Sequence, residues 1–140
     1  MKDMNCFLIA AMTADGFIGR QKDDNSFAWT STADKNFYLE KIKAADAIVM
    51  GSRTFNSFAK YPPNSRWIIY THQPEKFTNP KPELIEAEAT DERPKQLLAR
   101  LKKEGLKNIA ICGGSSIYTL FMEANVVDVL YLTVEPVLFG

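Results

Sequence analysis

The sequence is poor in the residues that build metal sites and disulfide frameworks. Its 140 residues contain one histidine, His72, and two cysteines, Cys6 and Cys112. Each cysteine lies in an apolar stretch without metal-ligand neighbours, which favours two buried free thiols over a disulfide. With a single histidine as the remaining candidate ligand, we expect no metal site.

The sequence also lacks an excess of charge and a long apolar run. Its 17 basic residues balance 17 acidic ones, so nothing indicates a nucleic-acid partner. No run of about 18 apolar residues is present, and the N-terminus has no signal-peptide pattern. These absences favour a cytoplasmic protein with no membrane partner. The length predicts a single domain over residues 1–140.

The chain does contain short apolar runs that alternate with helical patterns. The expected strands are residues 6–12, 47–50, 67–70, 109–112 and 127–134, with a weaker one near Leu84 and Ile85. One helical pattern runs from Asp34 to about Ala45, and another begins at Ser52. Two later segments that contain leucine or phenylalanine also have helical patterns. Strands that are apolar on both faces predict an α/β fold of three layers, a mostly parallel sheet with helices on both faces.

Glycine and polar residues follow three of the expected strands. The segments are Gly51-Ser52-Arg53-Thr54, Thr71-His72-Gln73 and Gly113-Gly114-Ser115-Ser116. Ligands of parallel sheets bind at the carboxyl ends of strands, where glycines and helix N-termini accept phosphates. Each segment alone is also compatible with a plain turn, and the G-x-G-x-x-G fingerprint is absent. Together the three segments suit an extended ligand with several phosphates, such as a dinucleotide.

Asp34 allows two interpretations. It shares one side of its helix with Tyr38 and Ile42, and a carboxylate on an apolar side is costly unless something pairs with it. Ser31 and Asp34 form a Ser-x-x-Asp pattern that is close to a capping box. Asp34 therefore either caps its helix or meets a ligand, and the two roles are compatible.

In order and spacing, these segments resemble the dihydrofolate reductase family and the related reductase domain of bacterial riboflavin biosynthesis, which shares its fold. The resemblance runs from about Asn5 to Gly140. It rests on residues 8–11 with 15–19, on Trp29 and Asp34, on residues 49–55, on residues 111–114 with Tyr118, and on residues 131–133.

The resemblance implies NADPH as the hydride donor and a pterin-type ring, foremost 7,8-dihydrofolate, as the acceptor. The implied catalytic residues are Asp34, Trp29 and Thr133, with Asp34 binding the amino-pyrimidine edge of the substrate and Thr133 orienting it. Tyr38, Phe58 and Arg66 are the other implied substrate contacts, and residues 20–28 the implied lid. The implied cofactor contacts are Ala11, Ile18, Gly19, Gly51, Ser52, Arg53, Thr54, Thr71, His72, Gly113, Gly114, Ser115, Ser116 and Tyr118.

Several positions depart from the folate branch of the family. Ser52 stands where the family usually has arginine, with Arg53 displaced by one, and Ser65 stands where the folate branch carries an arginine. The Asp15-Gly16 turn and residues 135–140 are more similar to the riboflavin branch. The alternatives are thus a reductase of a 5-amino-6-ribosylamino-pyrimidine and an NADPH-binding module without turnover. The protein is expected as a monomer or homodimer. Both branches carry further C-terminal strands, which the domain of residues 1–140 is interpreted as lacking.

Overall fold

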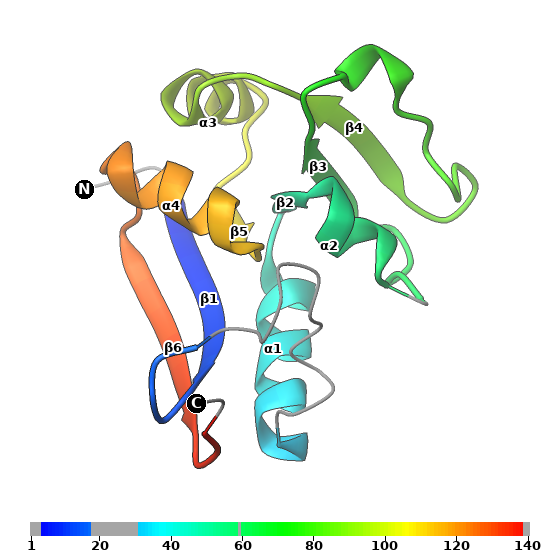
Figure 1. Ribbon diagram of the computed structural model, residues 1–140. Helices are drawn as coiled ribbons and strands as arrows, with labels where there is room; N and C mark the ends of the chain where they lie inside the picture. Colours follow the sequence, from blue (N-terminus) through cyan, green and yellow to red (C-terminus); the bar gives the residue numbers. More distant parts are fainter. Residues whose placement is uncertain (1–3, 18–30, 59, 139–140) are drawn as a thin grey trace.

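The computed structural model describes residues 4–17, 31–58 and 60–138, apart from the side chain of Asp34 (Figure 1). Within these ranges the chain forms one sheet of six strands. They are β1 (Asn5–Thr13), β2 (Ala47–Gly51), β3 (Arg66–Tyr70), β4 (Glu86–Thr90), β5 (Asn108–Ile111) and β6 (Val129–Glu135). Their order is β4-β3-β2-β5-β1-β6, and every neighbouring pair is parallel. The carboxyl ends of all six strands therefore point to the same edge of the sheet.

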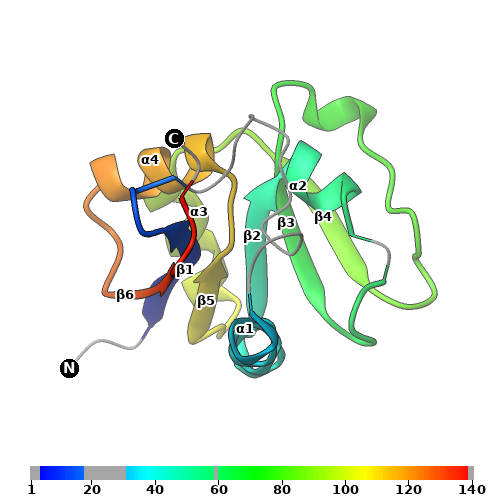
Figure 2. The ribbon, with the colours of Figure 1, turned by 60° about the horizontal axis from the view of Figure 1, so that its bottom comes forward.

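Among the described residues, four helices cover the two faces of the sheet. They are α1 (Thr32–Ala44), α2 (Ser52–Asn56), α3 (Pro94–Lys103) and α4 (Ser115–Glu123), with a short 3-10 helix, η2 (Pro74–Lys76), after β3. One core lies between the sheet and α3 and α4, through residues such as Leu97 and Phe121. The other lies between the sheet and α1 and α2, through Ile42 and Phe55 (Figure 2). This arrangement confirms the predicted three-layer α/β fold.

Both cores form because successive strand residues point to opposite faces. In β3, Trp67 and Ile69 face α1 and α2 while Ile68 faces α3 and α4, and all three are fully buried. The apolar runs predicted the interior strands for this reason. Cys6 and Cys112 are buried free thiols, as expected. Among the described helices, none is long and apolar enough to cross a membrane.

The outer strand β4 was harder to predict than the other strands. β4 has the sequence Glu-Ala-Glu-Ala-Thr, without an apolar run, and begins just after the weak strand expected at Leu84 and Ile85. β4 can carry charges because, in the part of the chain that the structure describes, it has a sheet neighbour on one side only. The helix after β4 begins at Pro94, and the Gln96 side chain accepts a hydrogen bond from the Arg93 N–H at 3.1 Å.

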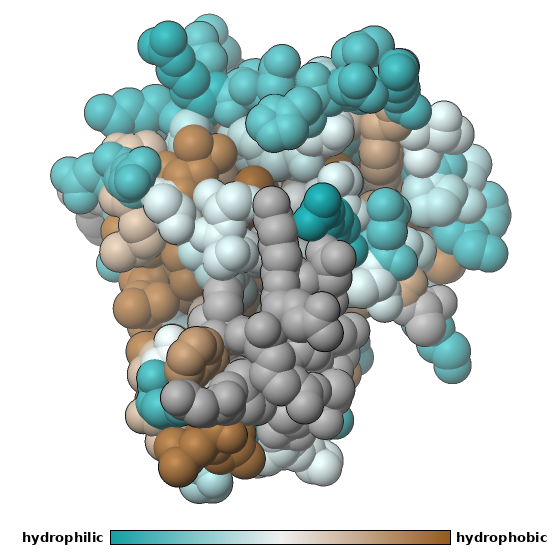
Figure 3. Space-filling view, in the orientation of Figure 1, coloured by the Kyte–Doolittle hydropathy of each residue, from teal (hydrophilic) through white to brown (hydrophobic). Residues whose placement is uncertain are grey.

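At the other edge, β6 exposes a row of apolar side chains. Leu130, Leu132 and Val134 are each about half exposed, on the face that α4 partly covers. Figure 3 shows apolar surface gathered over β6 and the adjoining part of α4. Within the described residues, β6 pairs with β1 alone.

Candidate active site at the carboxyl edge of the sheet

The ends of β2 and β5 are joined directly through their glycines. The Gly51 N–H donates a hydrogen bond to the Gly113 carbonyl at 2.8 Å. Gly113 has φ +123°, a backbone conformation that favours glycine, and the Gly113–Gly114 peptide bond is cis. The two glycine segments predicted from the sequence are therefore in contact.

The same glycines have neighbours that a Cβ atom would touch. A Cβ on Gly113 would lie 3.4 Å from the Tyr118 hydroxyl oxygen, and a Cβ on Gly114 would lie 3.3 Å from Thr54 Oγ1. A Cβ on Gly51 would meet Ile117 at 3.4 Å. The backbone is thus packed closely against the first turns of α2 and α4.

Tyr118 connects this junction to β1. Its hydroxyl donates a hydrogen bond to the Ile9 carbonyl at 2.7 Å. The pairing of β1 with β5 ends at Leu8 and Ile111, whereas its pairing with β6 continues to Thr13 and Glu135. Tyr118 therefore binds β1 where β5 has ended, beside the part of β1 that extends past it.

The beginning of α4 has the features of an anion site. The N-cap residue is Gly114, and no side chain caps the helix there. Ser115 and Ser116 form the first turn of this nine-residue helix. Free backbone N–H groups and the positive end of the helix dipole bind phosphates at such positions. The glycine junction and the uncapped helix fit the dinucleotide that the sequence implied.

Other predicted cofactor residues among those described lie along the same edge. Gly51 pairs in register with Tyr70, so Thr71 and His72 follow β3 beside the start of α2. Thr71 is partly buried and His72 is exposed. Ser52 and Arg53 open α2 directly after Gly51.

A second part of the edge is built by α1 and the end of β6. The Phe37 ring of α1 packs edge-on against Tyr131 of β6, with centroids 5.7 Å apart. Six residues earlier, the Ser31 N–H donates a hydrogen bond to Glu135 Oε1 at 3.0 Å. These two contacts fix α1 alongside β6, with the two elements running in opposite directions.

Asp34 and Thr133 both fall between those contacts. Asp34 lies between Ser31 and Phe37 along α1, and Thr133 lies between Tyr131 and Glu135 along β6. Ala11 pairs in register with Thr133. The structure therefore brings the backbones of Asp34, Thr133 and Ala11 to one region. Trp29, Ile18, Gly19 and the predicted lid at residues 20–28 lie outside the described residues.

The predicted substrate contacts Tyr38 and Phe58 lie on the face of the sheet that α1 covers. Both pack partly buried against its core, with Phe58 5.6 Å from Trp67 by ring centroids. Tyr38 is hydrogen-bonded to the Cys112 thiol. Burial raises the pKa of Cys112 to about 12, against a smaller lowering by Tyr38, so the thiol stays protonated and unreactive at neutral pH.

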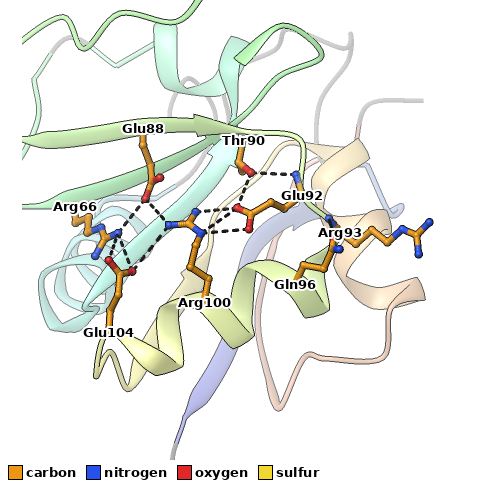
Figure 4. Close-up of polar contacts among 8 residues, drawn as sticks. All are labelled: Arg66, Glu88, Thr90, Glu92, Arg93, Gln96, Arg100 and Glu104. Carbon is orange, nitrogen blue, oxygen red and sulfur yellow. Dashed lines mark hydrogen bonds and ion pairs between the residues drawn. The ribbon is translucent and has the colours of Figure 1, made fainter. Parts of the chain in front are cut away.

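Arg66 is not brought to this edge. It opens β3 and thus lies at the amino end of the sheet, where its Nη2 contacts Glu88 at 2.9 Å and Glu104 at 3.1 Å (Figure 4). Burial lowers its pKa, but hydrogen bonds to the two glutamates outweigh this and raise the pKa overall. Two carboxylates of its own chain already bind the guanidinium, which leaves the predicted substrate contact without structural support.

Sequence reasoning did not single out Glu135. Its side chain is 7% exposed, and it is the only charged residue among the buried ones described. The available signal was a carboxylate closing the apolar run at residues 127–134. The pattern could not reveal its partner, because Ser31 lies 104 residues earlier in the chain.

Comparison with known proteins agrees with this architecture. A sequence model of the family named dihydrofolate reductase matches residues 5–135, nearly the whole chain. The chain belongs to the dihydrofolate reductase family. Its sequence is 26% identical to the uncharacterized protein YwjB of Bacillus subtilis, over 95% of this chain and 77% of that protein.

Solved structures related to this dihydrofolate reductase family member come from both branches. Dihydrofolate reductase from Enterococcus faecalis, complexed with NADP(H) and RAB-propyl, has a TM-score of 0.70 at 23% identity, over 97% of this chain and 73% of that one. The diaminohydroxyphosphoribosylaminopyrimidine deaminase/5-amino-6-(5-phosphoribosylamino)uracil reductase from Thermotoga maritima has a TM-score of 0.75 at 18% identity, over 99% of this chain and 46% of that one. At these identities the likeness shows the shared fold.

Proposed function

We propose that this protein is a cytoplasmic NADPH-dependent reductase that transfers a hydride to a pterin-type ring, with 7,8-dihydrofolate as substrate and tetrahydrofolate as product. The observation that carries the proposal is a pair of contacts between α1 and β6, Ser31–Glu135 and Phe37–Tyr131. The backbones of Asp34 and Thr133 lie between these two contacts, which supports a shared role for them at this edge. Membership of the dihydrofolate reductase family supports the same chemistry.

The cofactor side of the proposal rests on the glycine junction. The Gly113–Gly114 backbone and the uncapped start of α4 would accept the phosphates of NADPH. Thr54 and Tyr118, which contact this backbone, would hold the loop in position. Gly51, Ser52, Arg53, Thr71 and His72 would bind the rest of the dinucleotide along the same edge. When bound, NADPH supplies the hydride, and the protein supplies position and electrostatics.

The substrate side of the proposal rests on Asp34. Its carboxylate would accept two charge-assisted hydrogen bonds from the amino-pyrimidine edge of the ring, with Thr133 orienting it. A fixed negative charge there also favours protonation of the ring nitrogen next to the carbon that accepts hydride. Tyr38 and Phe58 would contact the ring from the α1 side.

The second candidate is reduction of a 5-amino-6-ribosylamino-pyrimidine. Ser65 favours it, because it stands where the folate branch carries an arginine for the glutamate tail of the substrate. The likeness in fold to the uracil reductase of Thermotoga maritima also favours it.

One assay separates the candidates. Purified protein is given NADPH with dihydrofolate or with the pyrimidine, and the loss of NADPH absorbance is followed. We expect loss with dihydrofolate, and Asp34→Asn should reduce that rate by at least a hundredfold. Loss of NADPH absorbance with the pyrimidine alone would support the second candidate. NADPH binding without a loss of absorbance with either substrate would show that the protein is a binding module without turnover.

Glu40→Gln is the matched control. Glu40 is an exposed acid on the same helix, so this substitution changes the charge as Asp34→Asn does. We expect it to keep the rate within twofold. An equal loss in both variants would contradict the role of Asp34.

A further inference from the structure

β6 is an edge strand without the charges that usually protect one. From Val129 to Val134 it carries no charged residue, and within the described residues it pairs with β1 alone. The strand at the opposite edge, β4, carries Glu86 and Glu88. An edge strand presents unpaired backbone N–H and C=O groups, and charged side chains normally keep other strands from pairing with them. β4 has this protection and β6 does not.

The face of β6 on the α4 side of the sheet is apolar and open. Leu130, Leu132 and Val134 point to this face because strand residues alternate, and they are 50%, 46% and 54% exposed. The helix α4 packs over β2 and β5, nearer the middle of the sheet, and so leaves this row of side chains exposed (Figure 3). On the other face, Tyr131 packs against the Phe37 ring of α1. The exposed apolar row thus lies on one face of β6.

This apolar row matches itself in an antiparallel pair of two β6 strands. Leu132 is the central residue of β6, and the row is symmetric about it. When Leu132 lies opposite Leu132 of a second copy, Leu130 lies opposite Val134 of that copy, and the two-fold axis repeats this contact in reverse. Residues that lie opposite each other in an antiparallel pair share a face, so the two rows form one apolar surface.

We propose that this chain forms a two-fold dimer through β6, with the two strands antiparallel and centred on Leu132. The partner is a second copy of the chain, because the row is complementary to itself and this part of β6 carries no charge that would favour a charged partner. The pairing joins two six-stranded sheets into one and covers the apolar row. A contact of one strand is at the small end of specific interfaces, so we expect a dimer Kd on the order of 10 µM.

The mass of the protein in solution tests the proposal without NADPH or any substrate. Light scattering should give twice the mass of one chain at concentrations well above this Kd, and the mass of one chain on dilution. Leu132→Lys places two like charges at the axis and should raise the dimer Kd roughly a hundredfold or more. Leu39→Lys is the matched control, because Leu39 is a similarly exposed leucine on α1. It should leave the dimer Kd within about twofold.

Two double variants at the same positions test the register. Leu130→Lys with Val134→Lys places like charges opposite each other and should abolish the dimer. Leu130→Lys with Val134→Glu places opposite charges across the axis and should keep the dimer Kd within about tenfold of the unsubstituted chain. Circular dichroism checks that each variant keeps the fold. Loss of the dimer in both folded variants would overturn the antiparallel register, because a parallel pair places Leu130 opposite itself.

Amide hydrogen exchange of the unsubstituted chain tests the contact without any substitution. Protection of β6 from Leu130 to Val134 should rise with protein concentration as the dimer forms, whereas protection of β3, inside the sheet, should change less. The proposal is overturned if the chain keeps the mass of one copy well above the expected Kd, or if folded Leu132→Lys dimerises as the unsubstituted chain does. It is also overturned if the mass doubles while β6 protection stays constant, because the dimer would then use another surface.

Discussion

The two parts of the carboxyl edge are built by different means. Between β2 and β5, the backbone itself forms the surface, with Gly51 packed against Ile117, and Gly113 and Gly114 packed against Thr54 and Tyr118. Between α1 and β6, side chains make the contacts. The Glu135 carboxylate accepts a hydrogen bond from the Ser31 N–H, and the Phe37 ring packs against Tyr131. The first part should thus be sensitive to added volume, and the second to loss of a polar group. In the proposed reaction this difference separates cofactor binding from substrate binding.

Gly113→Ala should have the largest effect on the glycine part. Its φ of +123° disfavours any side chain, and the new Cβ would lie 3.4 Å from the Tyr118 hydroxyl. We expect a loss of roughly 1–3 kcal/mol of stability and a Kd for NADPH raised at least tenfold. Denaturant unfolding and NADPH fluorescence titration measure the two effects. An unchanged Kd in the folded variant would show that the junction does not contact the cofactor.

Tyr118→Phe should have a smaller effect on the same part. It leaves the Ile9 carbonyl without its 2.7 Å hydrogen bond but keeps the ring. We expect about 1 kcal/mol less stability and a Kd for NADPH raised a few-fold. The KM for the ring substrate should not change, as measured by steady-state kinetics at saturating NADPH. A selective rise in KM would place Tyr118 on the substrate side.

The fold was predictable because its signals are local. Apolar runs marked β1, β2, β3 and β5, and glycines marked two of their ends. β4 was not predicted in place, because an edge strand with a charged face carries no such run. The glycine part of the site could be located because its glycines directly follow predicted strands in the sequence.

The α1–β6 part could be predicted only in outline. Asp34 and Thr133 followed from the resemblance to a family, whereas Glu135 depends on a contact across 104 residues. Arg66 shows the converse limit. Its position in the sequence suggested a substrate contact, but strand direction places it at the amino end of the sheet, beside Glu88 and Glu104.

Arg100→Met tests a region outside both parts. Hydrogen bonds from Arg100 hold the pKa of Glu92 below its usual value (Figure 4). A carboxylate with a lowered pKa in the folded state stabilises above its unfolded pKa, and this contribution is lost as pH falls through the folded pKa. The variant should therefore be less stable near neutral pH, with the difference shrinking on acidification. A difference that is constant across urea unfolding curves from neutral to acidic pH would contradict this assignment.

Arg66→Ala should have the smallest effect. Its partly exposed ion pairs with Glu88 and Glu104 predict a loss of stability of about 1 kcal/mol or less. Since Arg66 lies away from the carboxyl edge, both the Kd for NADPH and the KM for the ring substrate should stay within twofold. A selective rise in KM would restore Arg66 as a substrate contact.

The central claim is that this protein moves a hydride from NADPH to a pterin-type ring. The most direct measurement uses NADPH deuterated at the transferred position, with dihydrofolate in excess and mass spectrometry of the product. The account predicts one deuterium in each tetrahydrofolate formed, with product lost in Asp34→Asn and kept in Glu40→Gln. Product without deuterium, or bound NADPH that is never consumed, would contradict it.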